Sequence, residues 1–495
     1  MTTATNFANA MRNESARTLT ENGASCLNTT GSKVLDLFGT IGSLRGSDQN
    51  RVERLFADAY SENKLLATKC IFYGRDIRGG LGERFTFRRL LKYAAIHHPE
   101  CIRPNIDLIG IYGRYDDMYE LIGTPLEDEM WASMKRQLVK DLSDMGEGKH
   151  VSLLAKWIKT PDASSRETRK LGIMTALKLN FEVKMFKRLL RGLRKYIDIT
   201  EIHMSNGTWN EIDYEKVPSR AMFVHKKAFT KNDTARFTQY LLKVSSGEAK
   251  MNAATMYPYD IVEAYIGSKY TFNKLVEDPV LEGQWKNLPN YLEDEASAIV
   301  IADTSGSMSG RPMASALGLA IYFAERNKGP FNGLWMSFSE DSRINTLKGE
   351  TLAQKLASIN TEGWGWNTNL ESAFSKVLDI AVKNHVHPND MIKSLIIISD
   401  MEIDEAMNGH KDWLFYDAMR ARYEEAGYEL PNIVFWQVDA RHDTFHADKD
   451  RKGVQLCSGQ SPSTFQHLMH CVSMTPMQMM MEVLNSERYS VITVE

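Results

Sequence analysis

The sequence contains few cysteines and no long apolar run. Its 495 residues include five cysteines, an odd number, and no Cys-x-x-Cys pair occurs. Scattered cysteines indicate neither a disulfide framework nor a zinc site of the usual spacing. No apolar run approaches the roughly 18 residues that a membrane-spanning helix requires, and the first residues have neither the basic start nor the apolar core of a secretory signal. We therefore expect a protein of a reducing, cytoplasmic setting with no membrane partner.

Charge is distributed unevenly along the chain. The net charge of −3 combines −8 over residues 301–495 with +5 over residues 1–300, and residues 151–250 alone carry +10. The composition, 43% hydrophobic and 25% charged, is that of an ordinary globular protein, and the length predicts more than one domain. Positive charge concentrated in one region is typical of a nucleic-acid-binding surface.

The last two fifths of the chain alternate between strand and helix patterns. Short apolar runs separated by amphipathic segments are typical of a doubly wound parallel sheet, so residues 291–495 are predicted to form an α/β domain of this class. The predicted strands are 298–302, 333–338, 394–399, 432–438 and a last one near 453–457, and the predicted helices are 312–327, 351–358, 370–384, one near 411–426 and one near 475–485.

Residues 1–290 have a different pattern. Apolar residues recur at helical spacing and clean period-two alternation is rare, which favours an all-α domain built from paired helices. The segment 282–295, with Pro289 and a run of acidic residues, is the predicted link between the two domains.

A candidate cation site follows the first predicted strand of the α/β domain. The apolar run 299–302 leads directly into Asp303-x-Ser305-x-Ser307, and loops after such strands are where open α/β sheets bind ligands. One carboxylate and two hydroxyls on a tight loop are hard oxygen ligands that suit Mg²⁺, although Mn²⁺ fits the same set. The alternative is that these side chains only cap the following helix.

Two later features strengthen the cation hypothesis. Thr368 lies in a Gly-rich loop before a helix pattern, and Asp400 directly follows the predicted buried strand 394–399. Together with Asp303, Ser305 and Ser307, in this order, these residues resemble the metal-ion-dependent adhesion site of von Willebrand factor A domains. The resemblance implies that the hydroxyls bind the cation directly or nearly so, that the aspartates bind it directly or through water, and that one position stays open for an acidic group of a partner protein.

The same residues argue against catalysis. Asp303 and Asp400 could pass for an acid–base pair, but both are needed at the cation, and no nucleophile with its base is evident nearby. A hydrolase using two metal ions would need a second carboxylate cluster, which the sequence does not offer. We therefore expect a binding site or a structural clamp, not an enzyme.

A basic helix is predicted within the positively charged region. Over 183–196, apolar residues recur every three or four positions and would face a core, while cations occupy the opposite face. Such a face can follow a phosphate backbone, with binding that falls steeply with salt; the alternative is an ordinary solvated helix surface. The apolar set is Val183, Phe186, Leu189, Leu190 and Leu193, and the candidate RNA-binding residues are Lys184, Lys187, Arg188, Arg191, Arg194 and Lys195, extended by Lys226 and Lys227.

The segment Arg75–Arg84 is rich in glycine and arginine. It could cradle a phosphate, but it fits neither Gly-x-Gly-x-x-Gly nor a P-loop. The favoured interpretation is a tight turn between helices, in which Asp76 or Glu83 pairs with an arginine.

Several strings in the first part of the chain resemble TROVE-related proteins, in which a helical domain precedes a von Willebrand A domain. This is the organisation of the Ro autoantigen family, and the similarity is closer to a relative named domain of unknown function 2828. The resemblance implies HEAT-like helical repeats that form a ring over residues 1–290, closed by the A domain, and binding of small structured or single-stranded RNA in a ribonucleoprotein. The strings are 35–38 (Leu-Asp-Leu-Phe), 75–84, 113–117 (Gly-Arg-Tyr-Asp-Asp), 156–157, 209–219 and 228–229.

Two functions therefore remain open. The first is an RNA-binding protein of Ro type that also carries a Mg²⁺ site. The second is a cation-dependent protein-interaction module whose partner presents an acidic residue to the metal and which binds no RNA.

Overall fold

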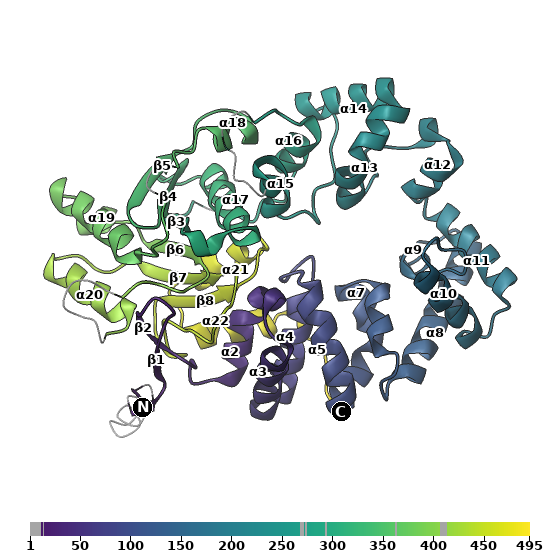
Figure 1. Cartoon of the computed structure of the whole chain (residues 1–495), viewed down its shortest axis with the longest axis horizontal. Helices are drawn as coiled ribbons and strands as arrows, with labels where there is room; N and C mark the ends of the chain where they lie inside the picture. The colour runs from purple at the N-terminus through teal and green to yellow at the C-terminus, as the bar shows by residue number, and fades with distance from the viewer. Residues whose placement is uncertain are drawn as a thin grey trace.

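The computed structural model describes residues 11–12, 14–267, 272, 275–292, 295–361, 364–405 and 413–495. A helical part comes first and an α/β part follows (Figure 1). Within the described residues, every helix is too short or too polar to cross a membrane.

The α/β part is built on one sheet, whose described strands run in the order β5-β4-β3-β6-β7-β8. All neighbours pair in parallel except β5, which is antiparallel to β4. The prediction of an α/β domain is therefore confirmed, with the correction that the sheet is mixed. The strands are β3 (Ala298–Asp303), β4 (Leu334–Phe338), β5 (Ser342–Thr346), β6 (Ser394–Ser399), β7 (Asn432–Gln437) and β8 (Val454–Ser458).

Alternate residues of the central strands point to opposite faces, and helices cover both (Figure 1). Val300 and Ile396 face one helical layer, whereas Ile301 and Ile397 face the other. Both faces of these strands are buried, as expected for parallel strands covered on each side. The first layer contains α17 (Arg311–Arg326), α18 (Leu352–Ala357) and α21 (Thr464–Cys471), and the second contains α19 (Leu370–Lys383) and α20 (Phe415–Glu425).

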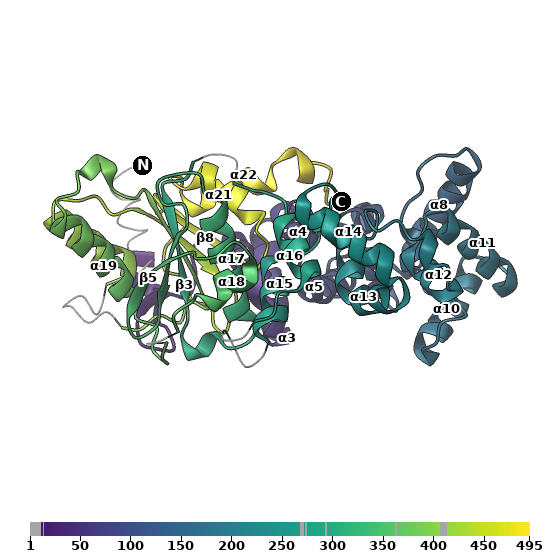
Figure 2. The same cartoon turned by 90° about the horizontal axis from the view of Figure 1, so that it is seen from above.

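The helical part forms an arc that leaves the α/β part and returns to it (Figure 1). Seen from above, the sheet lies at one end of the molecule and α8, α10 and α11 lie at the other (Figure 2). Short 3₁₀ turns join several helices. The helices are α2 (Lys33–Thr40), α3 (Gln49–Glu62), α4 (Lys64–Arg75), α5 (Arg84–His97), α6 (Pro99–Ile102), α7 (Ile109–Tyr112), α8 (Glu127–Gly146), α9 (Leu154–Trp157), α10 (Arg166–Lys178), α11 (Val183–Tyr196), α12 (Thr200–Asn206), α13 (Ser219–Asn232), α14 (Thr234–Ser246), α15 (Pro258–Ile266) and α16 (Pro279–Lys286).

Local sequence sets the ends of the first helices of the arc. Ser32, Asp48 and Asn63 each accept a hydrogen bond from a backbone N–H in the first turn of α2, α3 and α4. Such caps satisfy donors that have no partner inside a helix. Helix α3 packs against both α2 and α4.

The N-terminal hairpin packs on the α/β part, and the C-terminal segment packs in the helical part. A hairpin of β1 (Arg17–Leu19) and β2 (Ser25–Leu27) interrupts the predicted all-α region, and isolated bridges join Gly23 to Asp404 and Leu27 to Phe445. Conversely, α22 (Pro476–Leu484) and the 3₁₀ turn η7 (Glu487–Tyr489) pack in the core of the helical part.

The expected link between the parts also differs from the prediction. Residues 279–286 form α16, so the predicted link 282–295 begins inside a helix. Glu282 of α16 accepts hydrogen bonds from the backbone N–H groups of Leu352 and Ala353 at the start of α18, which ties the end of the arc to the α/β part.

Candidate metal centre

Two buried carboxylates lie side by side where β3 and β6 end. Asp303 is the last residue of β3 and Asp400 directly follows β6, its parallel neighbour. Neither side chain is exposed. Ser399 donates a hydrogen bond to Asp303 Oδ2 (2.6 Å), yet burial and the charge of Asp400 raise the pKa of Asp303 well above its usual range. The paired negative charge therefore favours a cation at this edge.

The two serines lie on the loop that follows β3. Asp303 Oδ1 accepts a hydrogen bond from Ser305 N–H (2.9 Å), and the hydroxyls of Ser305 and Ser307 are 3.0 Å apart. Gly306 between them donates its N–H to Gly365 O (3.0 Å). A Cβ at Gly306 would stand 2.3 Å from the Trp366 ring, so only glycine lets the two loops approach this closely.

That second loop carries Thr368. Its N–H donates to Asp404 Oδ2 (2.8 Å), and Asp404 N–H donates to Thr368 O (3.1 Å). Thr368 is fully buried, and its hydroxyl lies 3.4 Å from the amide nitrogen of Asn22. The residues predicted as metal ligands, Asp303, Ser305, Ser307, Thr368 and Asp400, thus belong to three adjoining loops at one edge of the sheet.

The donor set fits a small divalent cation. Asp400 Oδ2 is buried and makes no hydrogen bond within the described residues, and a buried carboxylate oxygen that accepts no hydrogen bond is costly. Two carboxylates and three hydroxyls are hard oxygen donors, the kind that Mg²⁺ and Mn²⁺ prefer. Asp303, Asp400, Ser305, Ser307 and Thr368 are therefore the residues that could hold such an ion.

An arginine that the sequence analysis missed stands at the same edge. Arg441 donates from Nη2 to Ser307 O (2.6 Å), and the same nitrogen lies 3.6 Å from Asp400 Oδ2. Its Nη1 lies 3.6 Å from Glu21 Oε2 and its Nε 3.9 Å from Asp439 Oδ2. The only signal in the sequence was topological, because Arg441 lies in the loop after β7, the strand next to β6.

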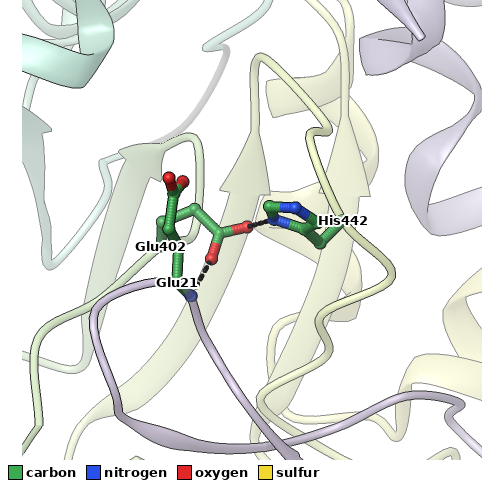
Figure 3. A group of neighbouring side chains, drawn as sticks. All are labelled: Glu21, Glu402 and His442. Carbon is green, nitrogen blue, oxygen red and sulfur yellow. Dashed lines mark hydrogen bonds and ion pairs between the residues drawn. The ribbon is translucent and has the colours of Figure 1, made fainter. Parts of the chain in front are cut away.

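A second cluster adjoins the first and was also missed. The carboxylates of Glu21 and Glu402 and the imidazole of His442 lie close together (Figure 3). Glu402 accepts a hydrogen bond from Glu21 N–H (2.6 Å), and its other oxygen is 3.1 Å from His442 Nδ1. Glu21 belongs to the N-terminal hairpin, so no local pattern could relate it to Glu402 and His442, which lie more than 380 positions later.

The turn after Asp400 has an unusual backbone. Met401 has φ 68°, the left-handed region that side chains other than glycine rarely adopt. Met401 N–H donates to Ser399 Oγ, and His446 Nε2 lies 3.0 Å from Met401 O. His446 is buried, and this burial lowers its pKa to about 4, so the neutral imidazole donates to the carbonyl and supports the turn.

The basic face of α11 is only partly as predicted. Phe186, Leu190 and Leu193 are buried, whereas Val183 and Leu189 are half-buried. On the opposite face four of the six predicted cations are exposed, and none of the four has an ion pair within the described part of the chain. These four, called the α11 stripe below, are Lys184, Arg188, Arg191 and Lys195.

Three other predicted RNA-binding residues have structural partners. Arg194 donates to Ala155 O (2.7 Å), and burial lowers the pKa of its guanidinium. Lys187 lies 3.7 Å from Asp162, and Lys226 pairs with Asp278. Lys227 is exposed on α13, apart from α11. Arg194, Lys187 and Lys226 therefore also make contacts within the described part of the chain.

The Gly-rich segment is a turn between α4 and α5, as favoured. Glu83 pairs with Arg45 (3.2 Å) and Asp76 pairs with Arg488. A Cβ on Gly80 would stand 2.1 Å from Tyr73 O. The glycines thus allow close packing, and the arginine partners come from distant parts of the chain.

Comparison with known proteins identifies the family. The family model described as domain of unknown function (DUF2828) matches residues 20–144 and 151–297, more than half of the chain. The chain belongs to this DUF2828 family. A second model, domain of unknown function (DUF7788), matches residues 297–490. This chain is also similar to the uncharacterized protein L728 of Acanthamoeba polyphaga mimivirus, with 28% identity over 510 residues. The match covers 94% of this chain and 86% of the viral protein.

Proposed function

We propose that this DUF2828 protein binds RNA through the α11 stripe. The observation that carries the proposal is that Lys184, Arg188, Arg191 and Lys195 are all exposed, with no ion pair within the described residues. Cations on a globular surface usually lie among acids of opposite charge, whereas this helix contains no acidic residue of its own and is flanked in the sequence by Glu182 and Asp198.

The spacing of the stripe suits a phosphate backbone. Its residues follow one another at intervals of four, three and four positions, so they lie along one side of the helix. At about 1.5 Å per residue they extend over roughly 16 Å, enough to contact several phosphates. Helix α11 lies at the end of the arc away from the sheet (Figures 1 and 2), which leaves the stripe clear of the α/β part.

The proposal also includes the relation of the two parts to TROVE and von Willebrand A domains. We infer that the arc is a TROVE-related set of HEAT-like helical repeats and that the α/β part is a von Willebrand A domain, which together would make a ring of Ro type. Both ends of the arc contact the α/β part: α2 packs against β8, and α15 packs against α17. This closure supports the ring interpretation.

The test is RNA recovery at low salt. Wild-type protein isolated from its native host should retain discrete RNA. Charge reversal of the α11 stripe (Lys184→Glu, Arg188→Glu, Arg191→Glu and Lys195→Glu) should abolish retention, and the wild-type affinity should fall steeply with salt. The matched control reverses four exposed lysines that are scattered over the surface, Lys243, Lys250, Lys348 and Lys383, for the same net charge. Equal loss of RNA in both variants, or no RNA retained by the wild type, would contradict the proposal.

A second function is favoured by the unsatisfied oxygen of Asp400. We propose that the edge binds Mg²⁺ or Mn²⁺ and that a partner protein with an acidic side chain docks there. A cation held by Asp303, Asp400 and the three hydroxyls would supply a positive charge with room for a further oxygen ligand. The site then acts by binding rather than by catalysis, because both aspartates serve the ion.

The two functions respond to different changes. Chelation, Asp303→Ala or Thr368→Ala should abolish capture of a protein partner while leaving RNA retention unchanged. The stripe variant should do the reverse. Partner capture that survives chelation would exclude the cation-dependent function.

A further inference from the structure

The turn of the N-terminal hairpin is docked beside the candidate metal centre. Thr20 Oγ1 donates to Ile403 O (2.6 Å), Glu21 N–H donates to Glu402 Oε2 (2.6 Å), and Asn22 Nδ2 donates to Glu402 O (2.7 Å). All three bonds reach the segment that directly follows Asp400. The turn is thus fixed to the loop that carries one of the two central carboxylates.

Asn22 also touches the other side of the site. Its amide nitrogen lies 3.4 Å from Thr368 Oγ1, and its backbone oxygen accepts from Glu405 N–H (3.3 Å). If the amide donates to the Thr368 hydroxyl, that oxygen keeps a lone pair for a cation. The hairpin therefore contacts two of the three loops that supply the predicted ligands.

One positive group already joins the hairpin to the metal centre. Arg441 Nη1 lies 3.6 Å from Glu21 Oε2, and Arg441 Nη2 lies 3.6 Å from Asp400 Oδ2. Two carboxylates from distant parts of the chain thus lie near a single guanidinium. A divalent cation carries twice the charge and would draw the same two carboxylates together more strongly.

Glu21 is better suited than Glu402 to serve as a movable ligand. Both carboxylate oxygens of Glu402 are engaged, one by Glu21 N–H and the other by His442 (Figure 3). The Glu402 side chain is 1% exposed. The Glu21 side chain is 54% exposed, and its one ion pair within the described residues is with Arg441. Its carboxylate can therefore reorient without breaking a buried network.

We propose that Glu21 is an acidic ligand that the chain itself supplies to the cation held by Asp303 and Asp400, so that cation binding clamps the N-terminal hairpin onto the sheet. This inference rests on the proposed cation site. It assigns the remaining ligand position to a residue of the same chain, and an acidic partner protein must then displace Glu21 to bind.

The clamp makes cation binding and hairpin docking mutually stabilising, because coupling between two equilibria is reciprocal.

The full-length protein is titrated with Mg²⁺ alone by calorimetry, and backbone hydrogen exchange over residues 19–24 is followed with and without Mg²⁺. The variants are Glu21→Gln, Asp400→Asn, and Glu14→Gln as a matched control. Glu14 is an exposed acid of the same segment that pairs with Arg17, so its change removes the same charge.

Wild type and Glu14→Gln should bind Mg²⁺ equally, and Mg²⁺ should slow exchange at residues 19–24. Glu21→Gln should bind about tenfold more weakly or worse, with loss of that protection. Equal affinity of Glu21→Gln and wild type, or exchange that ignores Mg²⁺, would overturn the clamp. Asp400→Asn distinguishes failure of the cation site from failure of the clamp. If Asp400→Asn binds Mg²⁺ like wild type, the proposed cation site is wrong. If Asp400→Asn loses Mg²⁺ binding while Glu21→Gln keeps wild-type affinity, only the role of Glu21 is contradicted.

Discussion

Arg488 donates from both Nε and Nη2 to the carboxylate of Asp76, a residue 412 positions earlier in the chain. Asp76 is fully buried, and it also accepts a hydrogen bond from Tyr489 (3.0 Å). The hydrogen bonds that Arg488 donates to Asp76 raise the pKa of its guanidinium. This ion pair connects the turn between α4 and α5 with the end of the chain.

Arg488→Gln should destabilise the protein. The substitution removes the charged partner of the buried Asp76 carboxylate. Because the Arg488 side chain is 36% exposed, water screens the pair in part, and we expect a loss of about 1–3 kcal/mol in the free energy of unfolding. Urea denaturation of the full chain measures the change. Arg78→Gln, which alters an exposed arginine of the same turn, is the control and should be near neutral.

Gly42→Ala should destabilise through close backbone contact. A Cβ there would stand 2.7 Å from the backbone of Gly459 and 2.8 Å from that of Ser458, and backbone atoms cannot swing aside as a side chain can. We expect a loss of about 2 kcal/mol in the free energy of unfolding. Gly46→Ala is the comparison, because a Cβ at Gly46 meets nothing within 4 Å. A loss of equal size at both positions would contradict the packing argument.

Asp400→Asn should have opposite effects with and without Mg²⁺. In the absence of the ion it removes the charge that helps to raise the pKa of Asp303, so the variant should be as stable as wild type or more so. With excess Mg²⁺ the wild type should gain stability by mass action, about 2.7 kcal/mol at a hundred times the Kd, and the variant should gain little. Thermal unfolding in EDTA and in Mg²⁺ distinguishes these outcomes, and an equal gain in both proteins would contradict the assignment of Asp400.

His446 should make the folded state sensitive to acid. Its pKa is lowered from 6.5 to about 4 by burial, so the unfolded chain takes up a proton between these values while the folded chain does not. The stability that this residue contributes is complete above pH 6.5 and is lost as the pH falls toward 4. The size of the loss at pH 4.5 is roughly 2–3 kcal/mol.

The measurement compares wild type with His446→Gln at pH 7.5 and pH 4.5 by urea denaturation. The comparison is needed because Asp303, with a raised pKa, contributes in the opposite direction in both proteins. At pH 7.5 the free energy of unfolding of His446→Gln should be lower than that of wild type, and at pH 4.5 this difference should be smaller by roughly 2–3 kcal/mol. A constant difference would mean that His446 is not held neutral.

The central strands were predictable because each is an apolar run with turn residues on both sides. Strands β3, β6 and β7 lie within one residue of the predicted ranges. Strand β5 was not predicted, since Ser-Arg-Ile-Asn-Thr is an edge strand with a single apolar residue, Ile344, and that residue is exposed. Helix α21 was missed as well, and the predicted helix near 411–426 begins at Phe415, with residues 411 and 412 outside the described part of the chain.

The site residues that directly follow strands could be predicted from the sequence. Those supplied by segments distant in the sequence could not. Asp303 and Asp400 could be placed together because parallel neighbours end at the same edge. Nothing local connects Glu21 or Asn22 with Glu402, because their contact depends on how the N-terminal hairpin packs. The charge of α11 was visible in the sequence, but the use of Arg194 to hold Ala155 O depends on the neighbouring helix α9.

The packing of α22 and η7 against α2 and α4 also sets the timing of folding during synthesis. The first helices emerge from the ribosome long before Leu484 and Tyr489, which complete their core. At roughly 5–20 residues per second, the 412 residues between Asp76 and Arg488 take about 20–80 seconds to translate. For that interval an apolar surface of the nascent chain stays uncovered, so ribosome-bound chains that stop short of α22 should depend on chaperones that recognise such surfaces.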